Sequence, residues 1–172
     1  TPKNAGVYSA KIEIKNKNYI TNQSEFELRI VEAAQNQLVI TGLPGTVEYG
    51  DEFALEVFGG ADGGEVEWSA GENADVDSNG NVKITGTGKI EITATKKSEN
   101  YNDITARLVL TALRKNVTFE LGGLEQTYGK TEDIKVIPSV SGITGKDYEI
   151  TYNQSSVRPE NAGKYKVRVN IT

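Results

Sequence analysis

The sequence predicts an all-β fold without substantial helix, arranged as small modules in tandem. Apolar and polar residues alternate with period two along the whole chain, and no sustained period of 3.6 reaches helical length. Glycine-rich turn signals separate the alternating stretches, and several segments recur. The hydrophobic content of 37% is that of a folded globular protein.

The clearest alternating stretches read as half-buried strands. In the first, Tyr8, Ala10 and Ile12 point to one face, whereas Ser9 and Lys11 point to the other. In order along the chain the stretches are residues 8–14, 25–30, 52–57, 89–94, 108–110, 117–121, 148–152 and 165–171. With the shorter apolar runs between them, we expect about ten or eleven strands.

Turn chemistry between the strands favours small sandwiches or barrels. Glycines cluster over residues 59–64 and at 122–123. Asn79-Gly80 is the typical pair of a two-residue hairpin, in which both residues adopt positive φ.

Internal repetition divides the chain into three modules. The matching segments are 2–8 (PKNAGVY) with 159–165 (PENAGKY), 18–19 with 100–101, and 49–50 (YG) with 128–129 (YG). The offsets indicate a repeat of about 80 residues, with modules at 1–34, 35–113 and 114–172. Because the chain contains no Met, we expect it to be a slice of a longer protein.

The repeat predicts that both terminal modules are incomplete. Residues 158–171 align with residues 1–14, and residues 15–34 have no counterpart in the last module. An isolated pair of strands is marginal in water, and an unpaired apolar edge seeks a partner. We therefore expect residues 1–34 of one copy to complete residues 115–172 of another, head to tail.

Composition excludes most enzyme mechanisms. The chain has no His and no Cys, so it lacks imidazole and thiol chemistry. Glu65 and Glu67, like Glu25 and Glu27, lie two apart on a solvent-facing side of a strand, where nothing supplies the cleft of a glycosidase. We expect a non-enzymatic protein that requires no cofactor.

Charge and hydropathy indicate which kinds of partner the chain is not expected to bind. The chain carries 24 acidic and 19 basic residues, and residues 35–113 alone carry 13 acidic and 5 basic. An acidic surface repels phosphate, and no apolar stretch has the ~20 residues of a membrane span. We expect neither nucleic-acid binding nor membrane insertion.

One segment resembles a calcium loop in part. Asp75, Asp77 and Asn79, followed by Gly80, satisfy the first six positions of the EF-hand pattern. The twelfth position is Gly86 where a bidentate Glu is needed. We therefore expect a hairpin turn built on Asn79-Gly80, with calcium binding as the alternative.

Five aromatic residues are expected to have structural roles. For the single tryptophan, Trp68, we favour core packing against Leu55 and Ile92 over a sugar-stacking platform. Four tyrosines recur at equivalent repeat positions, which favours a structural role such as a turn-bridging hydroxyl over a ligand role. They are Tyr8, Tyr49, Tyr128 and Tyr165.

These motifs resemble two families of bacterial repeats. The segments 67–69 (EWS), 74–82 (ADVDSNGNV) and 86–95 (GTGKIEITAT) resemble a bacterial immunoglobulin-like domain of group 2, spanning about residues 36–113. The flanking segments 127–130, 159–165 and 18–19 are similar to MBG or YGX-type repeats, although Lys130 stands where that pattern usually has Asp. The resemblance implies immunoglobulin-like sandwiches, with the flanking modules either of that fold or of another small β fold.

The resemblance also implies an exported, multi-repeat protein of a bacterial surface, an adhesin or a secreted polysaccharide enzyme, and it implies no catalytic residue. We expect an extracellular spacer whose junctions, residues 32–37 and 111–116, are semi-rigid because they lack Pro, Gly and Ser richness. The alternative is a module that binds a carbohydrate or a host protein through exposed Tyr19, Tyr101 or Tyr152. A Lys-to-Asn or Lys-to-Asp cross-link inside a core also stays open.

Overall fold

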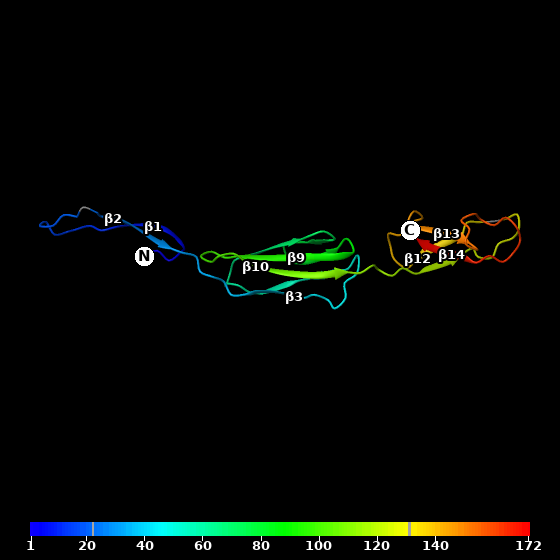
Figure 1. Ribbon diagram of the computed structural model, residues 1–172, viewed down its shortest axis with the longest axis horizontal. Helices are drawn as coiled ribbons and strands as arrows, with labels where there is room; N and C mark the ends of the chain where they lie inside the picture. Colours follow the sequence, from blue (N-terminus) through cyan, green and yellow to red (C-terminus); the bar gives the residue numbers. More distant parts are fainter. Residues whose placement is uncertain (22, 131) are drawn as a thin grey trace. The chain divides into compact units, whose positions relative to one another are not determined.

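The computed structural model describes residues 1–21, 23–130 and 132–172, and within these ranges the protein is all β (Figure 1). Fourteen strands are present, more than the ten or eleven predicted, because several have only three or four residues. The chain forms two compact units, Thr1–Lys115 and Asn116–Thr172. None of the described residues forms a helix with the length and apolar character needed to cross a membrane.

The first unit opens with an antiparallel pair, β1 (Gly6–Lys11) and β2 (Glu25–Ile30). Tyr8 lies opposite Leu28, and Ala10 lies opposite Phe26, so their apolar side chains share one face. The predicted strand over 8–14 is shorter than expected, because regular pairing ends at Lys11. No described side chain of residues 1–34 is fully buried, since no second layer covers this face.

The rest of the first unit, the middle module, is a two-layered sandwich. One layer has the strand order β3-β5 followed by β4-β8-β7, and the other has the order β6-β9-β10. This is the ABED and CFG arrangement of an immunoglobulin sandwich. The strands are β3 (Leu38–Thr41), β4 (Glu52–Ala54), β5 (Glu56–Gly59), β6 (Glu65–Ala70), β7 (Ala74–Val76), β8 (Asn81–Ile84), β9 (Gly88–Lys97) and β10 (Ile104–Ala112).

The first layer of the sandwich is divided into two sheets at Leu55. The single strand predicted over 52–57 is instead two strands: β4 pairs with β8, whereas β5 pairs with β3. Between them the backbone N–H of Leu55 donates to the carbonyl oxygen of Gly80 at 2.8 Å. The Leu55 side chain, at the break between β4 and β5, is 2% exposed and belongs to the core.

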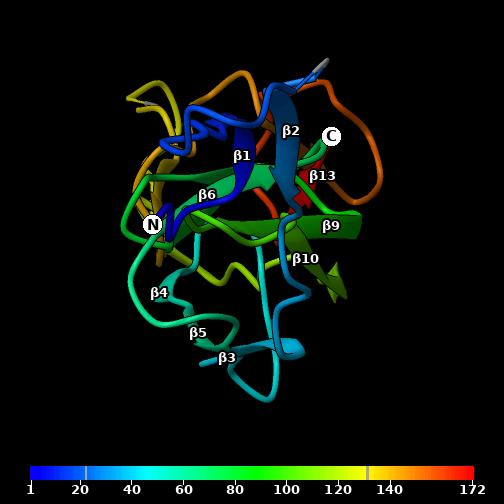
Figure 2. The same cartoon turned by 90° about the vertical axis from the view of Figure 1, so that its left-hand side faces the viewer.

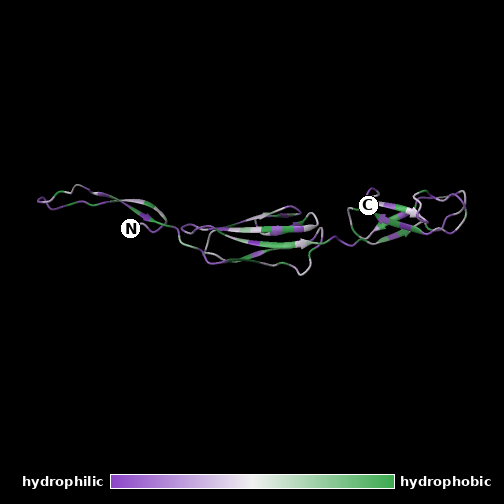
Figure 3. Ribbon diagram, in the orientation of Figure 1, coloured by the Kyte–Doolittle hydropathy of each residue, from purple (hydrophilic) through white to green (hydrophobic). Residues whose placement is uncertain are grey.

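The core lies between the two layers of the middle module, which are visible in Figure 2 as β6 and β9 above β3, β4 and β5. Ile90 and Ile92 of β9 are fully buried and pack with Val82 and Ile84 of β8. Burial alternates along β9 and β10, and the strands of the sandwich carry green, hydrophobic stretches in Figure 3. Every fully buried side chain among the described residues lies in this module.

Gln35 anchors the junction between the β1-β2 pair and the sandwich. Its side-chain nitrogen donates to the carbonyl oxygens of Lys96 and Asn102, and its oxygen accepts from the N–H of Ala61. Close by, the backbone of Ala33 exchanges hydrogen bonds with Asn100 and Asn102 at 2.9 Å each. Specific hydrogen bonds therefore hold this junction.

The second unit consists of two antiparallel pairs, β11 (Phe119–Gly122) with β12 (Lys135–Pro138) and β13 (Tyr148–Tyr152) with β14 (Val167–Ile171). Phe119 and Tyr148 pack edge to face, with ring centroids 5.8 Å apart. No side chain of this unit is fully buried within its described residues. The unit has strands but lacks a closed core.

Candidate functional site

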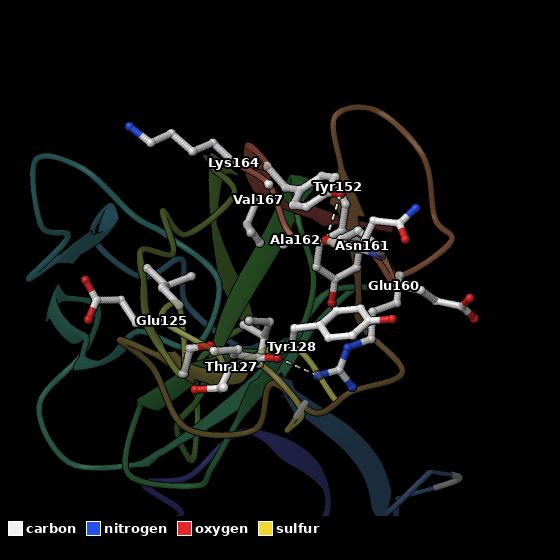
Figure 4. Close-up of a pocket in the computed structure, with 17 residues that line it drawn as sticks. Glu125, Thr127, Tyr128, Tyr152, Glu160, Asn161, Ala162, Lys164 and Val167 are labelled. Carbon is white, nitrogen blue, oxygen red and sulfur yellow. Dashed lines mark hydrogen bonds between the residues drawn. The ribbon is translucent and has the colours of Figure 1, made fainter. Parts of the chain in front are cut away.

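The second unit contains a cavity of about 960 Å³ (Figure 4). Aromatic side chains from three segments line it: Tyr128 after β11, Tyr152 at the end of β13, and Tyr165 just before β14. The charged ends of Glu125, Glu160 and Lys164 point outward in Figure 4. The cavity is therefore aromatic on its walls and charged at its rim.

Arg158 fixes one wall of this cavity. Its guanidinium donates to the side-chain oxygen of Gln126 at 2.9 Å, forms an ion pair with Asp133 at 3.1 Å and contacts the carbonyl oxygen of Glu132. Gln126 in turn donates to the carbonyl oxygens of Gly123 and Glu132. This network ties the segment before β14 to the loop between β11 and β12, so the wall is preorganised.

The repeated tyrosines Tyr8 and Tyr165 make the same contact. The hydroxyl of Tyr8 donates to the carbonyl oxygen of Asn4 at 2.9 Å, and that of Tyr165 donates to the carbonyl oxygen of Asn161 at 3.0 Å. Both rings lie over a glycine of the repeat, Gly6 or Gly163. The shared sequence thus forms one local structure twice.

Tyr49 and Tyr128 occupy a second repeated turn with a different role for the side chain. Each is followed by a glycine at positive φ, Gly50 or Gly129, as a type II turn requires. The two residues are 51% and 73% exposed, and neither hydroxyl has a hydrogen-bond partner among the described residues. Among the described residues, the predicted bridging hydroxyl is therefore found at Tyr8 and Tyr165 and not at Tyr49 or Tyr128.

The segment that resembles a calcium loop forms the β7-β8 turn. The prediction of a two-residue hairpin was wrong: four residues, 77–80, connect the strands, and only Gly80 of the Asn79-Gly80 pair has positive φ. The carboxylate of Asp77 accepts from the backbone N–H groups of Asn79 and Asn81 and from the Asn81 side chain. Those bonds with Asn81 and Asn79 lower the pKa of Asp77 below its ordinary value.

These bonds bear on the calcium alternative at Asp75, Asp77 and Asn79. Both carboxylate oxygens of Asp77 already accept hydrogen bonds from the turn. Asp75 lies on β7, outside the turn, and its side chain is exposed. Within the described part of the chain, no group of three or more acidic residues is arranged to hold a metal ion.

Trp68 lies half-buried on β6 and packs against both core clusters, including the one that contains Leu55 and Ile92. Its ring also covers the β7-β8 turn: a Cβ added to Gly80 would lie 3.1 Å from two of its ring atoms. A second contact, 2.5 Å from the carbonyl oxygen of Leu55, closes the same space. Trp68 therefore has packing partners on the sheet and at the turn.

The carboxylate pairs, Tyr19 and Tyr101 lie apart from the cavity lining. Glu67 forms an ion pair with Lys97 at 2.7 Å, and this contact raises the pKa of Lys97. Tyr19 lies in the loop between β1 and β2, and Tyr101 lies in the turn between β9 and β10. Of the tyrosines considered for ligand binding, only Tyr152 lines the cavity.

Comparison with known families assigns part of the chain. Residues 117–172 match the MBG domain. The match confirms the MBG resemblance predicted for residues 114–172 and supports a repeat-type module of surface proteins. No curated protein matches the chain.

Sequence reasoning missed the residues that hold the cavity wall and the junction. Arg158, Gln126 and Gln35 belong to no motif, and each makes contacts with residues far away in the chain. Their only sequence signal is a long polar side chain at the edge of an apolar stretch, which is too common to single them out.

Proposed function

We propose that this chain is a non-catalytic structural region of an extracellular bacterial surface protein or adhesin, where its modules act as a spacer. The observation that carries the proposal is the MBG match at residues 117–172 immediately after an independent β-sandwich. A series of β modules gives reach, and hydrogen-bonded junctions such as that at Gln35 limit bending.

We also assign the middle module to the group 2 immunoglobulin-like family. Its strand order supports this, and so do the positions of the three sequence elements. Trp68-Ser69 lies on β6, residues 74–82 form the β7-β8 hairpin, and residues 88–95 lie within β9.

Localisation gives a direct test of the surface role. Antibodies raised against the chain are expected to label intact cells of the organism that encodes it, without permeabilisation. Labelling only after permeabilisation would contradict an extracellular position. Single-molecule stretching of the full chain tests the spacer role separately, because a mechanical module must resist extension with discrete unfolding events.

The cavity supports a second candidate, binding of a glycan or a host protein. Three tyrosines on one hollow provide the clustered aromatics that sugar stacking requires. NMR titration with bacterial and host oligosaccharides tests this candidate. Saturable shifts that disappear in Tyr152→Ala and persist in Tyr101→Ala, which is outside the cavity, would favour binding over a pure spacer.

A further inference from the structure

We propose that residues 47–51 and residues 113–115 form a latch that bears mechanical load where the chain leaves the sandwich. Such a latch presupposes the spacer role proposed above, and it names the contacts that resist extension. Three observations carry it: the two segments pair in parallel, the chain enters and leaves at opposite ends of β10, and the Asp51 carboxylate contacts both segments.

Backbone hydrogen bonds join the two segments of the latch. The N–H of Leu113 donates to the carbonyl oxygen of Val47, and the N–H of Tyr49 donates to the carbonyl oxygen of Leu113, each at 2.9 Å. Leu113 and Glu48 form a parallel bridge. The segment that follows β10 is therefore held by the turn that precedes β4.

The same turn is fixed to β8 on its other side. The N–H of Gly50 donates to the carbonyl oxygen of Ile84 at 3.0 Å, and the N–H of Ile84 donates to the carbonyl oxygen of Asp51 at 2.9 Å. Ile84 is 1% exposed and belongs to the core. The turn thus links the outgoing segment to the first layer of the sandwich.

Tension acts on the latch along its length. Where the chain enters, Ala33 exchanges hydrogen bonds with Asn100 and Asn102, just before β10 begins, whereas Leu113 directly follows the end of β10. The nine residues of β10 separate these points by about 30 Å along the strand direction. Stretching therefore pulls residues 47–49 toward the entry and residues 113–115 toward the exit. Because parallel segments pulled in this way slide along each other, the hydrogen bonds between them are loaded together.

The latch borders the larger core cluster of the module. Detachment of β3, which pairs with β5 over four residues, removes no fully buried side chain from this cluster, because Leu38 belongs to the smaller one. Val47 and Ala112, 4% and 2% exposed, both belong to the larger cluster. Separation of the latch therefore opens the main core to water, which makes the latch the step that limits forced unfolding.

The Asp51 carboxylate strengthens the latch at two points. One oxygen accepts a hydrogen bond from the backbone N–H of Glu48 at 2.8 Å, and the other lies 3.5 Å from the ammonium group of Lys115. One side chain thus closes the turn and contacts the outgoing segment. Hydrogen bonds to an ionised group are stronger than those between neutral groups.

The second copy of the Tyr-Gly motif separates these two contacts. The N–H of Lys130 donates to the carbonyl oxygen of Thr127 at 2.9 Å, as the N–H of Asp51 donates to that of Glu48 at 3.1 Å. A lysine side chain accepts no hydrogen bond, yet the turn forms. The Asp51 carboxylate is therefore not needed to form the turn, and the contact that distinguishes it is the one with Lys115.

Constant-force stretching of the full chain tests the latch, with cysteines added at both ends because the chain has none. Unfolding of the middle module is recognised by a lengthening of roughly 250 Å, since about 80 residues extend by ~3.5 Å each. Asp51→Ala is expected to raise the rate of this event about tenfold or more, because it removes two contacts of an ionised group from the latch.

Asp77→Ala is the matched control for Asp51→Ala. The carboxylate of Asp77 also closes a turn, with hydrogen bonds from the N–H groups of Asn79 and Asn81 at 2.8 and 2.9 Å, but that turn lies between β7 and β8, away from the entry and the exit. Both variants are expected to lose stability in urea. Under force, Asp77→Ala is expected to unfold at a rate close to that of the wild type.

A second pair of variants keeps the test decisive if Asp51→Ala does not fold. Lys115→Glu places a carboxylate beside that of Asp51, whereas Arg114→Glu makes the same charge change at an exposed neighbour that forms no ion pair among the described residues. Lys115→Glu is expected to speed forced unfolding, and Arg114→Glu is not. Equal rates within either pair would overturn the latch and leave the spacer role standing. A wild-type chain that extends without discrete events would contradict both.

Discussion

At the residue scale, Gly80 joins the β7-β8 turn to the core of the middle module. Its φ is +83°, and an added Cβ would meet the carbonyl oxygen of Leu55 at 2.5 Å and the ring of Trp68 at 3.1 Å. Backbone strain and overpacking therefore act together in Gly80→Ala, which is expected to lower the free energy of unfolding by about 2–4 kcal/mol. Urea unfolding followed by Trp68 fluorescence measures this change.

Gly63→Ala is the matched control for Gly80→Ala. Gly63 also has positive φ, at +69°, but an added Cβ would have no neighbour within 4 Å. Its expected cost is the backbone term alone, about 1 kcal/mol. Equal effects of the two substitutions would contradict a packing role for Trp68 over the turn.

Asp77 predicts a pH dependence of stability. Hydrogen bonds from Asn81 and Asn79 lower the pKa of its carboxyl in the folded protein, so the stabilisation is present above about pH 4, the unfolded value, and is lost as pH falls through the lower folded value. The thermal midpoint is expected to fall on acidification, and to fall less in Asp77→Asn. Thermal scans from neutral to acidic pH check this.

The control for Asp77 is Asp75→Asn on the adjacent strand, whose side chain is exposed and makes no hydrogen bond among the described residues. Some acid sensitivity is expected to persist in Asp77→Asn, because hydrogen bonds from Thr144 also lower the pKa of Asp147. Identical acid profiles for the wild type and Asp77→Asn would refute the assigned role.

The structural role of a residue can be predicted from the sequence when that role depends on adjacent residues. The repeat picked out Tyr8 and Tyr165, and the glycine at position 80 marked a turn, because a corner or a positive φ depends on adjacent residues. The conformation of Asn79 was not predictable, since it depends on the turn being four residues long. That length depends on where the pairing of β7 and β8 ends.

At the element scale, Gln35 determines how firmly the β1-β2 pair is joined to the sandwich. Gln35→Ala removes three hydrogen bonds, to Lys96, Asn102 and Ala61, and is expected to destabilise the first unit by about 1–2 kcal/mol. NMR relaxation is expected to show faster independent motion of β1 and β2. Gln37→Ala is the control, because the exposed Gln37 side chain makes no hydrogen bond among the described residues.

Period-two alternation predicted the elements well where a strand keeps the same partners along its length, as in β9 and β2. It failed at 52–57, where alternation continues through Leu55 while the hydrogen-bonding partner changes from β8 to β3. It also failed to anticipate the cavity. The cavity is lined by residues from the loop between β11 and β12, from β13 and from the segment before β14, and alternation within one strand does not indicate which loops and strands meet.

At the scale of the whole molecule, the two units differ in how they are stabilised. All fully buried side chains of the described residues lie between Leu38 and Ala112, whereas the second unit has a large cavity and none. Burial of apolar surface is the main stabilising contribution to a small domain, so the second unit is expected to have the lower free energy of unfolding.

The single tryptophan makes this difference measurable without labels. Trp68 belongs to the first unit, so its fluorescence follows that unit alone, whereas far-UV circular dichroism follows the strands of both. In urea, the circular dichroism is expected to begin changing at lower concentration than the fluorescence, because unfolding of the second unit precedes that of the first. Coincident transitions would mean that the units unfold together, and the second unit would then have to draw its stability from the first.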